Sequence, residues 1–322
     1  MKNGFLYPIF ERKMSNPSTY KVGFIDRTGE QVIEPVFDGA VPFREGLASV
    51  KQGEKWGAID SSGRMKIQPV SDSALRIAEN RIVYSVGARR GVMDLEGKVV
   101  VEPKYQMIGE FQESTAWVSS FGMYGFIDAG GNELIAPFYE DARSFSEGVA
   151  SVRAGGRWGY VNKQLEMIIP LQFDLALPFS EGLARVQKSK KWGYINHQGE
   201  YVIAAQYEAA RDFREGLAEV QVEDRWGYIY HSGKMAIPAE FRYSDEFAEG
   251  LAAAGPFDES GNRIGFINQA GVFVISPQFL AVGRFRHGLC FVEFDEEIAY
   301  IDRAGRIVWR GPYVDVGSAY KL

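Results

Sequence analysis

The sequence predicts an all-β fold made of about nine tandem repeats, each a three-stranded antiparallel β-meander. Three observations predict it: a glycine recurs at a fixed period, a turn motif follows that glycine at a fixed distance, and apolar pairs flank the turn. The period is 34 residues at every step except one of 38. The anchor positions are Gly23, Gly57, Gly91, Gly125, Gly159, Gly193, Gly227, Gly265 and, in the ninth place, Ala299. A fixed period of about 20–50 residues is typical of solenoids and propellers, whose units cannot bury their apolar surface alone. We therefore expect a single repeat domain over residues 1–322.

The turn of each repeat begins three residues after the anchor. An Asp or Asn occupies that position and a Gly follows three residues later, as in Asp60 and Gly63. The Asx side chain can accept a hydrogen bond from a backbone N–H two residues on, and glycine supplies the positive φ that a bulged hairpin needs. Leu165 replaces the glycine in one repeat and Tyr230 replaces the Asx in another. We expect those two turns to be strained or altered.

Two strands flank this turn and a third precedes the anchor. Apolar pairs stand on either side of the turn, as in Tyr194-Ile195 and Val202-Ile203. Adjacent residues of a strand point to opposite faces, so these pairs indicate that both faces of each small sheet are covered. The third strand is the segment "GLASV" at 46–50 and its counterparts.

The segment that returns to the next repeat carries large aromatic residues. One lies fourteen residues past the anchor, such as Phe37, and a Phe lies twenty past it, such as Phe43. Such side chains bury about 150–250 Å² each, so we expect them to pack between consecutive repeats. A glutamate follows two residues later, as at Glu45, and its constant place before a turn predicts hydrogen bonding to the backbone and not a ladder of metal ligands.

Taken together, these residues resemble a known repeat. The stretches "KWGYINHQGEYVI" and "FDLALPFSEGLARVQKSKKWGYIN" are similar to the WG repeat, also written KWG repeat, which is found mainly in bacterial proteins. The resemblance extends from about Val22 to Tyr313. Departures cluster in one region, where Arg90 stands in place of Trp and Asn80 in place of Gly. The resemblance implies a repeat architecture without catalysis and names no activity.

The repeats can stack in an open or a closed array. Propellers usually have about 4–8 blades of four strands, which nine anchors with three strands each do not match. The last repeat, "AYIDRAGRIVWRGPY", nevertheless lacks the polar outer cap that an open array needs. On the count of strands and repeats we favour an open or incompletely closed superhelix, with a closed β-propeller-like ring as the alternative.

Composition excludes several functional classes. The net charge is −6, from 36 Lys and Arg against 42 Asp and Glu, which disfavours binding to nucleic acid or to an anionic membrane. The single cysteine, Cys290, cannot form an internal disulfide. No stretch approaches the roughly 20 apolar residues of a membrane span, and the apolar run near the amino terminus is too short for a signal peptide. The cytoplasm is therefore the expected location.

Residues with catalytic or metal-binding chemistry are scarce. Only three histidines exist, His197, His231 and His287, and two imidazoles without a third ligand make a poor metal site. Phosphate-binding glycine loops and nucleophile motifs are missing from the sequence. We expect no catalytic residues, no metal and no cofactor.

Non-repeated positions are where a binding function is expected to lie. Trp117 and Phe291 occupy a repeat position that elsewhere holds small or polar residues, so they are either exposed anchors for a partner or extra packing. Weaker candidates are one basic pair, one basic run and one insertion. They comprise Arg89 and Arg90, then Lys188, Lys190 and Lys191, and the insertion "PFDESGN" at 256–262.

These features favour a non-enzymatic scaffold that binds another protein. The partner could be a secreted or toxic protein that this chain neutralises or docks. One alternative is binding of a glycan or cell-wall polymer through aromatic slots on successive repeats. Another is an enzyme whose site is assembled from non-repeated positions.

Overall fold

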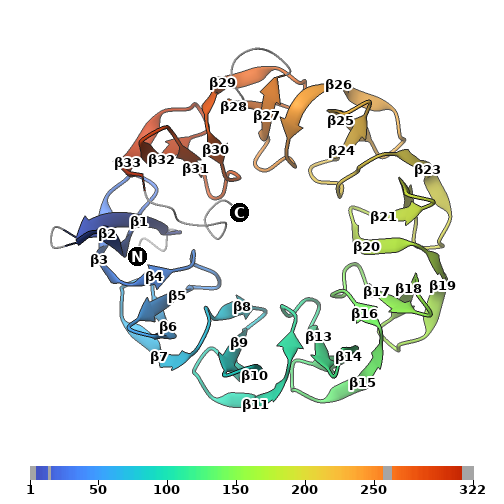
Figure 1. Cartoon of the computed structure of the whole chain (residues 1–322), viewed down its shortest axis with the longest axis horizontal. Helices are drawn as coiled ribbons and strands as arrows, with labels where there is room; N and C mark the ends of the chain where they lie inside the picture. Colours follow the sequence, from blue (N-terminus) through green and yellow to red (C-terminus); the bar gives the residue numbers. More distant parts are fainter. Residues whose placement is uncertain (1–4, 14–15, 257–262, 314–322) are drawn as a thin grey trace. The chain divides into compact units, whose positions relative to one another are not determined.

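The computed structural model describes residues 5–13, 16–256 and 263–313, which fold as β-strands and turns (Figure 1). Within that part of the chain the strands β1 to β33 form eight antiparallel sheets: one of three strands, six of four and one of six. The six-stranded sheet contains two repeat anchors, Gly227 and Gly265. None of the described residues belongs to a helix long and apolar enough to cross a bilayer. The prediction of an all-β fold is confirmed.

The chain divides into two compact units. Unit 1 comprises Met1–Glu110 and Phe279–Leu322, and unit 2 comprises Phe111–Gln278. The strands of unit 1 are β1 (Tyr7–Lys13), β2 (Asn16–Ile25), β3 (Gln31–Phe37), β4 (Gly39–Ala40), β5 (Leu47–Gln52), β6 (Lys55–Asp60), β7 (Met65–Ser71), β8 (Arg76–Ala78), β9 (Arg81–Val86), β10 (Arg89–Asp94), β11 (Val99–Tyr105), β12 (Met107–Ile108), β30 (Ala281–Val282), β31 (Leu289–Glu293), β32 (Glu297–Asp302) and β33 (Ile307–Pro312).

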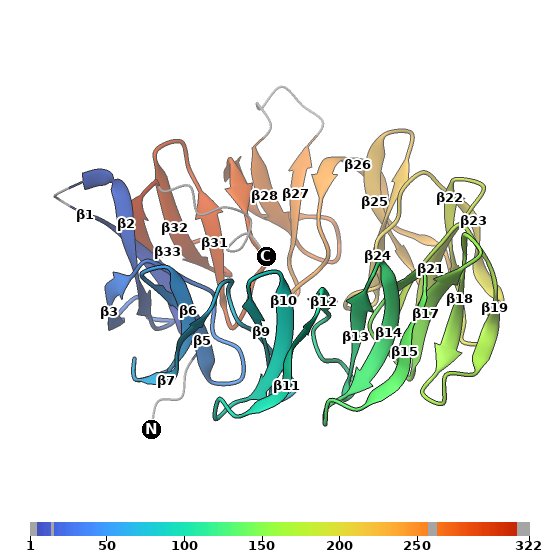
Figure 2. The ribbon, with the colours of Figure 1, turned by 60° about the horizontal axis from the view of Figure 1, so that its bottom comes forward.

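Unit 2 holds the middle repeats, and successive strands of a sheet lie side by side there, as β17, β18 and β19 do in Figure 2. The strands of this unit, the last of which ends one residue beyond it, are β13 (Thr115–Ser120), β14 (Met123–Asp128), β15 (Glu133–Tyr139), β16 (Asp141–Ala142), β17 (Val149–Ala154), β18 (Arg157–Asn162), β19 (Met167–Phe173), β20 (Leu175–Ser180), β21 (Leu183–Lys188), β22 (Lys191–Ile195), β23 (Tyr201–Tyr207), β24 (Leu217–Val222), β25 (Arg225–Tyr230), β26 (Met235–Ser244), β27 (Ala252–Pro256), β28 (Ile264–Ile267) and β29 (Phe273–Phe279).

The predicted three-stranded repeat is wrong, because most sheets have a fourth strand. In four repeats this strand is only two residues long, as in β4, where Ala40 pairs with Val50 of β5. Two residues are too few to show an alternating pattern, so the strand is invisible in the sequence. Four antiparallel strands in succession are the usual content of a propeller blade.

The predicted open superhelix is also wrong, because the first and last repeats meet inside unit 1. Strand β1 contacts β33, and Figure 1 shows them side by side. The Tyr300 hydroxyl donates a hydrogen bond to the Pro8 carbonyl at 3.0 Å, and one apolar cluster contains both Phe10 and Tyr300. The fold is therefore a β-propeller, the alternative that the sequence left open. The missing polar cap on the last repeat correctly indicated a closed array, whereas the count of strands wrongly indicated an open one.

The predicted turn chemistry is confirmed. The Asp60 carboxylate accepts hydrogen bonds from two following backbone N–H groups at 2.9 and 3.1 Å, and Gly63 adopts a φ of +82°. Leu165 has a φ of +63°, a strained value for a side chain with a Cβ. The turn at Tyr230 keeps its main-chain hydrogen bond from the Gly233 N–H at 2.8 Å and lacks only the side-chain acceptor.

Packing between repeats also follows the prediction. Phe43 lies 5.0 Å from Phe24 of the preceding sheet, ring centre to ring centre, and Phe213 lies 4.9 Å from Tyr194 in the same way. The repeated glutamates accept backbone hydrogen bonds from the next repeat, as Glu181 does from the Gly216 N–H at 3.0 Å. Each glutamate therefore fixes the turn of its neighbour.

Candidate functional site

Two adjoining cavities in unit 1 form the candidate site. Their volumes are about 720 and 300 Å³, and both are lined by Arg44, Ile77 and Arg286. The larger one is also lined by Phe5, Phe43, Glu45 and His287, and the smaller one by Arg76 and Glu110. We call the pair of cavities the arginine cavity.

Two of its arginines occupy the same position in their repeats. Arg44 and Arg286 each lie 21 residues past an anchor, in the turn that leads into the second strand of a sheet. The backbone N–H of Arg44 donates to the Leu47 carbonyl at 2.8 Å, and that of Arg286 donates to the Leu289 carbonyl at 2.9 Å. These bonds close a tight turn at the base of each arginine, so the repeat itself fixes where the two side chains emerge.

Strand β1 holds the turn that carries Arg286. The Tyr7 hydroxyl contacts the carbonyls of Arg286 and His287 at 3.0 and 2.8 Å. The His287 ring stacks on Phe5, with the ring centres 4.3 Å apart. The meeting of the first and last repeats therefore builds one wall of the arginine cavity.

The three lining arginines differ in how far they are neutralised. The Arg44 Nη1 atom lies 3.0 Å from Glu110 Oε2, and the Arg76 guanidinium donates to the main-chain carbonyl of Ile108. The Arg286 guanidinium makes no hydrogen bond or ion pair with any residue that the structure describes. Among the described residues, one cation of the cavity is thus without a counter-charge.

The positive charges act on one another. Burial lowers the pKa of Arg76, and the charge of Arg90 lowers it further, against the opposing effect of Glu110. Burial likewise lowers the pKa of Arg286, and the charges of Arg44 and Arg284 add to this. Because Arg286 is exposed, solvent screens this repulsion and the free energy involved is small. Guanidinium groups stay charged in proteins, so three positive charges line the cavity at neutral pH.

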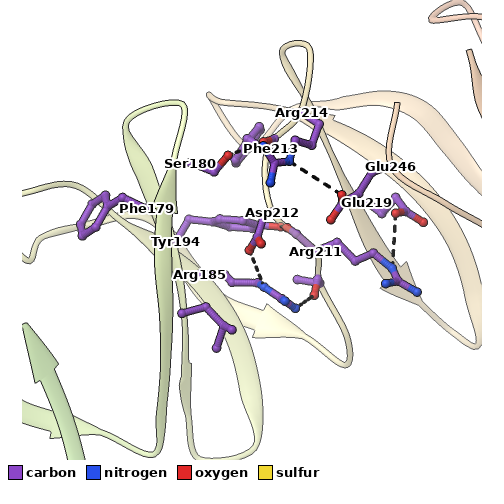
Figure 3. Close-up of polar contacts among 12 residues, drawn as sticks. Phe179, Ser180, Arg185, Tyr194, Arg211, Asp212, Phe213, Arg214, Glu219 and Glu246 are labelled. Atoms are coloured by element: carbon purple, nitrogen blue, oxygen red, sulfur yellow. Dashed lines mark hydrogen bonds and ion pairs between the residues drawn. The ribbon is translucent and has the colours of Figure 1, made fainter. Parts of the chain in front are cut away.

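Two arginines of unit 2 are paired with carboxylates (Figure 3). Arg185 Nε lies 2.6 Å from Asp212 Oδ1, and Arg214 Nε lies 3.8 Å from Glu246 Oε2. Arg214 occupies the same repeat position as Arg44 and Arg286. The arginine at this repeat position therefore has a carboxylate partner in unit 2 and also at Arg44 in unit 1, but at Arg286 none of the described residues supplies one.

A buried carboxylate lies in the same region of unit 2. Glu219 is fully buried, its Oε1 atom accepts a hydrogen bond from the Ser244 hydroxyl at 2.5 Å, and its Oε2 atom lies 3.4 Å from Arg211 Nε. Burial raises the pKa of Glu219 to about 7, although Ser244 and Arg211 both act to lower it. This group titrates near neutral pH but has no access to solvent.

The two aromatic residues singled out by the sequence are packed side chains. Trp117 on β13 is half-buried, with its ring centre 5.5 Å from that of Tyr124. Phe291 on β31 is 4 % exposed and contacts Tyr300 edge-on, with ring centres 5.7 Å apart. They lie in different units, and the structure places neither of them in the arginine cavity.

The basic candidates lie on hairpins. Arg89 is exposed and donates to a main-chain carbonyl at 3.1 Å, whereas the half-buried Arg90 acts on Arg76 beside the arginine cavity. The exposed lysines Lys188, Lys190 and Lys191 cluster where β21 turns into β22. Residues 257–262 of the predicted contact loop lie outside the described residues.

Sequence reasoning missed Arg44, Arg76 and Arg286. For Arg44 and Arg286, the available signal was the position 21 residues past each anchor, where arginine alternates with small or uncharged residues. The residues at this position are, in order, Arg44, Ala78, Gln112, Ser146, Ser180, Arg214, Ala248 and Arg286. The described residues include no group of three or more His, Cys, Asp or Glu side chains that could hold a metal ion.

Comparison with solved structures finds the same fold in a protein of very different sequence. A eukaryotic initiation factor superposes with a TM-score of 0.64 at 12% identity, over 96% of this chain and 96% of that one. The dihydro-heme d1 dehydrogenase NirN superposes with a TM-score of 0.49 at 12% identity, over 98% of this chain and 76% of that one. At such identities the likeness concerns the fold alone. No curated protein matches the sequence.

The repeats themselves match a described family. The WG containing repeat matches eight consecutive segments, at residues 23–56, 56–88, 91–120, 124–158, 158–192, 192–226, 226–254 and 264–297. These segments cover most of the chain, and each begins at an anchor identified from the sequence or one residue before it. The chain belongs to the WG containing repeat family.

Proposed function

We propose that this repeat propeller is a non-catalytic scaffold that docks a protein partner through the arginine cavity of unit 1. The observation that carries the proposal is the guanidinium of Arg286, which lines the same cavity as Arg44 and has no counter-charge among the residues that the structure describes. An acidic side chain of a partner would supply that charge, and hydrogen bonds between ionised groups are the stronger ones.

The mixed lining of the cavity supports a protein as the ligand. Phe5, Phe43 and Ile77 line the larger cavity together with Arg44 and Arg286. Aromatic residues and arginine are the side chains enriched at protein interfaces. A long polyanion is a poorer match, because the chain carries a net charge of −6 and the basic area is local.

The glycan alternative receives less support. It required exposed aromatic slots on successive repeats, whereas the aromatic residues of the candidate site, Phe5 and Phe43, line a single cavity beside two arginines. We therefore propose the protein-docking function alone.

Capture of a partner from extracts of the source cells tests the proposal. We expect the chain to retain one protein at about equimolar ratio, with Arg286→Glu weakening retention by at least about tenfold, as for a central interface residue. Arg214→Glu is the matched control, since it changes the same repeat position in unit 2, and it should retain the partner. Equal retention by both variants would place docking elsewhere and overturn the proposal.

A further inference from the structure

We infer that the arginine cavity takes a phosphate monoester, carried on a phosphorylated serine or threonine of the partner. The inference rests on the proposed docking function and adds the chemical class of the group that is recognised. Three features of the cavity carry it: its net charge, its unused donors and its size.

The positive charge in and around the cavity favours a dianion. Three guanidinium groups line it, those of Arg44, Arg76 and Arg286, and two carboxylates line it, those of Glu45 and Glu110. The lining alone therefore has one positive charge in excess. The charges of two neighbouring arginines, Arg90 and Arg284, also act on the lining arginines and add to this excess. A phosphorylated side chain carries about −1.5 to −2 at neutral pH, whereas a carboxylate would neutralise only the excess of the lining itself.

One of the two carboxylates is committed elsewhere. Glu45 accepts hydrogen bonds from the backbone N–H groups of Glu79 and Asn80 at 2.6 and 2.8 Å. Four other repeated glutamates, Glu113, Glu147, Glu181 and Glu215, have the same structural role. Of the two lining carboxylates, Glu110 is therefore the one that pairs with an arginine, and that arginine is Arg44.

The donors of the cavity come from three separate elements. Arg44 emerges from the turn after β4, Arg76 from the start of β8 and Arg286 from the turn after β30. A guanidinium has five N–H donors in a planar fork. Arg44 directs one nitrogen to Glu110 and Arg76 one nitrogen to Ile108, so donors remain on both. A tetrahedral phosphate has three terminal oxygens to accept from several directions, whereas a carboxylate has two oxygens in one plane.

The cavity is large enough for more than the phosphate itself. Its larger part measures about 720 Å³ and has Phe5, Phe43 and Ile77 in its lining. Apolar surface beside the arginines would contact residues that flank a phosphorylated side chain. This arrangement favours a group carried on a peptide over a free anion.

Calorimetric titration of the full chain at constant ionic strength tests the inference. The probes are capped phosphoserine (N-acetyl, carboxamide), capped glutamate and inorganic phosphate. We expect capped phosphoserine to bind at least about tenfold more tightly than capped glutamate, because several charge-assisted hydrogen bonds are added. Inorganic phosphate should bind no more tightly than capped phosphoserine.

Two variants locate the binding. Arg286→Ala should weaken binding of capped phosphoserine by about tenfold. Arg214→Ala, which removes an exposed arginine from the same repeat position in unit 2, should change it by less than about twofold. Three results would each overturn the inference. The two variants could weaken binding equally, capped phosphoserine and capped glutamate could bind equally, or inorganic phosphate could bind more tightly than capped phosphoserine. If Arg286→Glu abolishes partner capture while phosphoserine shows no preference, the docking function stands and the phosphate inference fails.

Discussion

The two units place different side chains at the same position of the repeat, and the space between their sheets differs accordingly. In unit 2, Ser146 and Ser180 lie 21 residues past their anchors and donate to main-chain carbonyls of the following repeat at 2.7 and 2.8 Å. Figure 3 shows Ser180 reaching Phe213 in this way, with the paired Arg214 beside it. In unit 1 the same position holds Arg44, Ala78 and Arg286, and the two arginines line the arginine cavity. An arginine at this position is not sufficient for a site, because Arg214 of unit 2 pairs with Glu246. The difference lies in Arg286, for which the described residues supply no carboxylate.

Both units nevertheless depend on the same packing at the anchor, and the largest predicted effect tests this. A Cβ at Gly23 would lie 2.5 Å from the Ile33 oxygen, and one at Gly193 would lie 2.6 Å from the Ile203 oxygen. Backbone cannot yield to such contacts cheaply, so Gly23→Ala and Gly193→Ala should each lower the free energy of unfolding by about 4 kcal/mol. Urea unfolding measures both. A large loss in one unit with little in the other would show that the anchors are not equivalent.

Glu219 makes the stability of unit 2 depend on pH. Its pKa is about 7 in the folded chain against 4.5 ordinarily, so between these values the folded state binds more protons than the unfolded state. The free energy of unfolding should therefore fall by about 3 kcal/mol as pH rises through this window. The groups that face the carboxylate are Arg211, Ser244, Asp245 and Glu246. The same repeat position in unit 1 holds Ser49, which does not titrate in this range.

The variant Glu219→Gln separates this effect from other carboxylates. Glutamine keeps an oxygen for the Ser244 hydroxyl but carries no charge at any pH. We expect the variant to match the natural chain near pH 4.5 and to exceed its free energy of unfolding by about 3 kcal/mol at pH 8. Urea unfolding between these pH values measures the difference. A constant difference across the range would show that Glu219 does not titrate in the folded chain.

A smaller effect tests how unit 1 positions Arg286. Tyr7→Phe removes the hydroxyl that contacts the carbonyls of Arg286 and His287, and it should cost about 1–2 kcal/mol of folding free energy. It should also weaken binding of capped phosphoserine, because the Arg286 turn is less well fixed. In unit 2, Tyr194→Phe removes a hydroxyl that donates to the Arg211 carbonyl at 2.7 Å. That control should lose similar stability with unchanged binding, and weakened binding in both variants would argue for a general loosening.

Much of the fold was predictable from particular residues. The recurring glycine, the Asx turn exemplified by Asp60 and the aromatic Phe43 each have a local physical cause that repeats, so their roles could be deduced. The strand at Gly39–Ala40 could not, because two residues carry no periodicity. Closure of the array was equally hidden, since it depends on contacts such as that of Tyr300 with Pro8, which are 292 residues apart.

The candidate site was only partly accessible from the sequence. Non-repeated positions were where a binding function was expected, and size drew attention to Trp117 and Phe291, which the structure packs against neighbouring side chains. The significance of Arg286 depends on the residues around it: Arg214 occupies the same position and differs by having Glu246 nearby. Such pairing is set by contacts between repeats, which a single sequence does not reveal.

The free energy of unfolding in phosphate and in chloride, at equal ionic strength, tests the contrast between the units most directly. The natural chain and Arg214→Ala should gain stability in phosphate, by about 1.4 kcal/mol when its concentration is ten times the dissociation constant. Arg286→Ala should gain less than half as much. An equal gain in all three proteins, or no gain in the natural chain, would contradict the account of an uncompensated cation in unit 1.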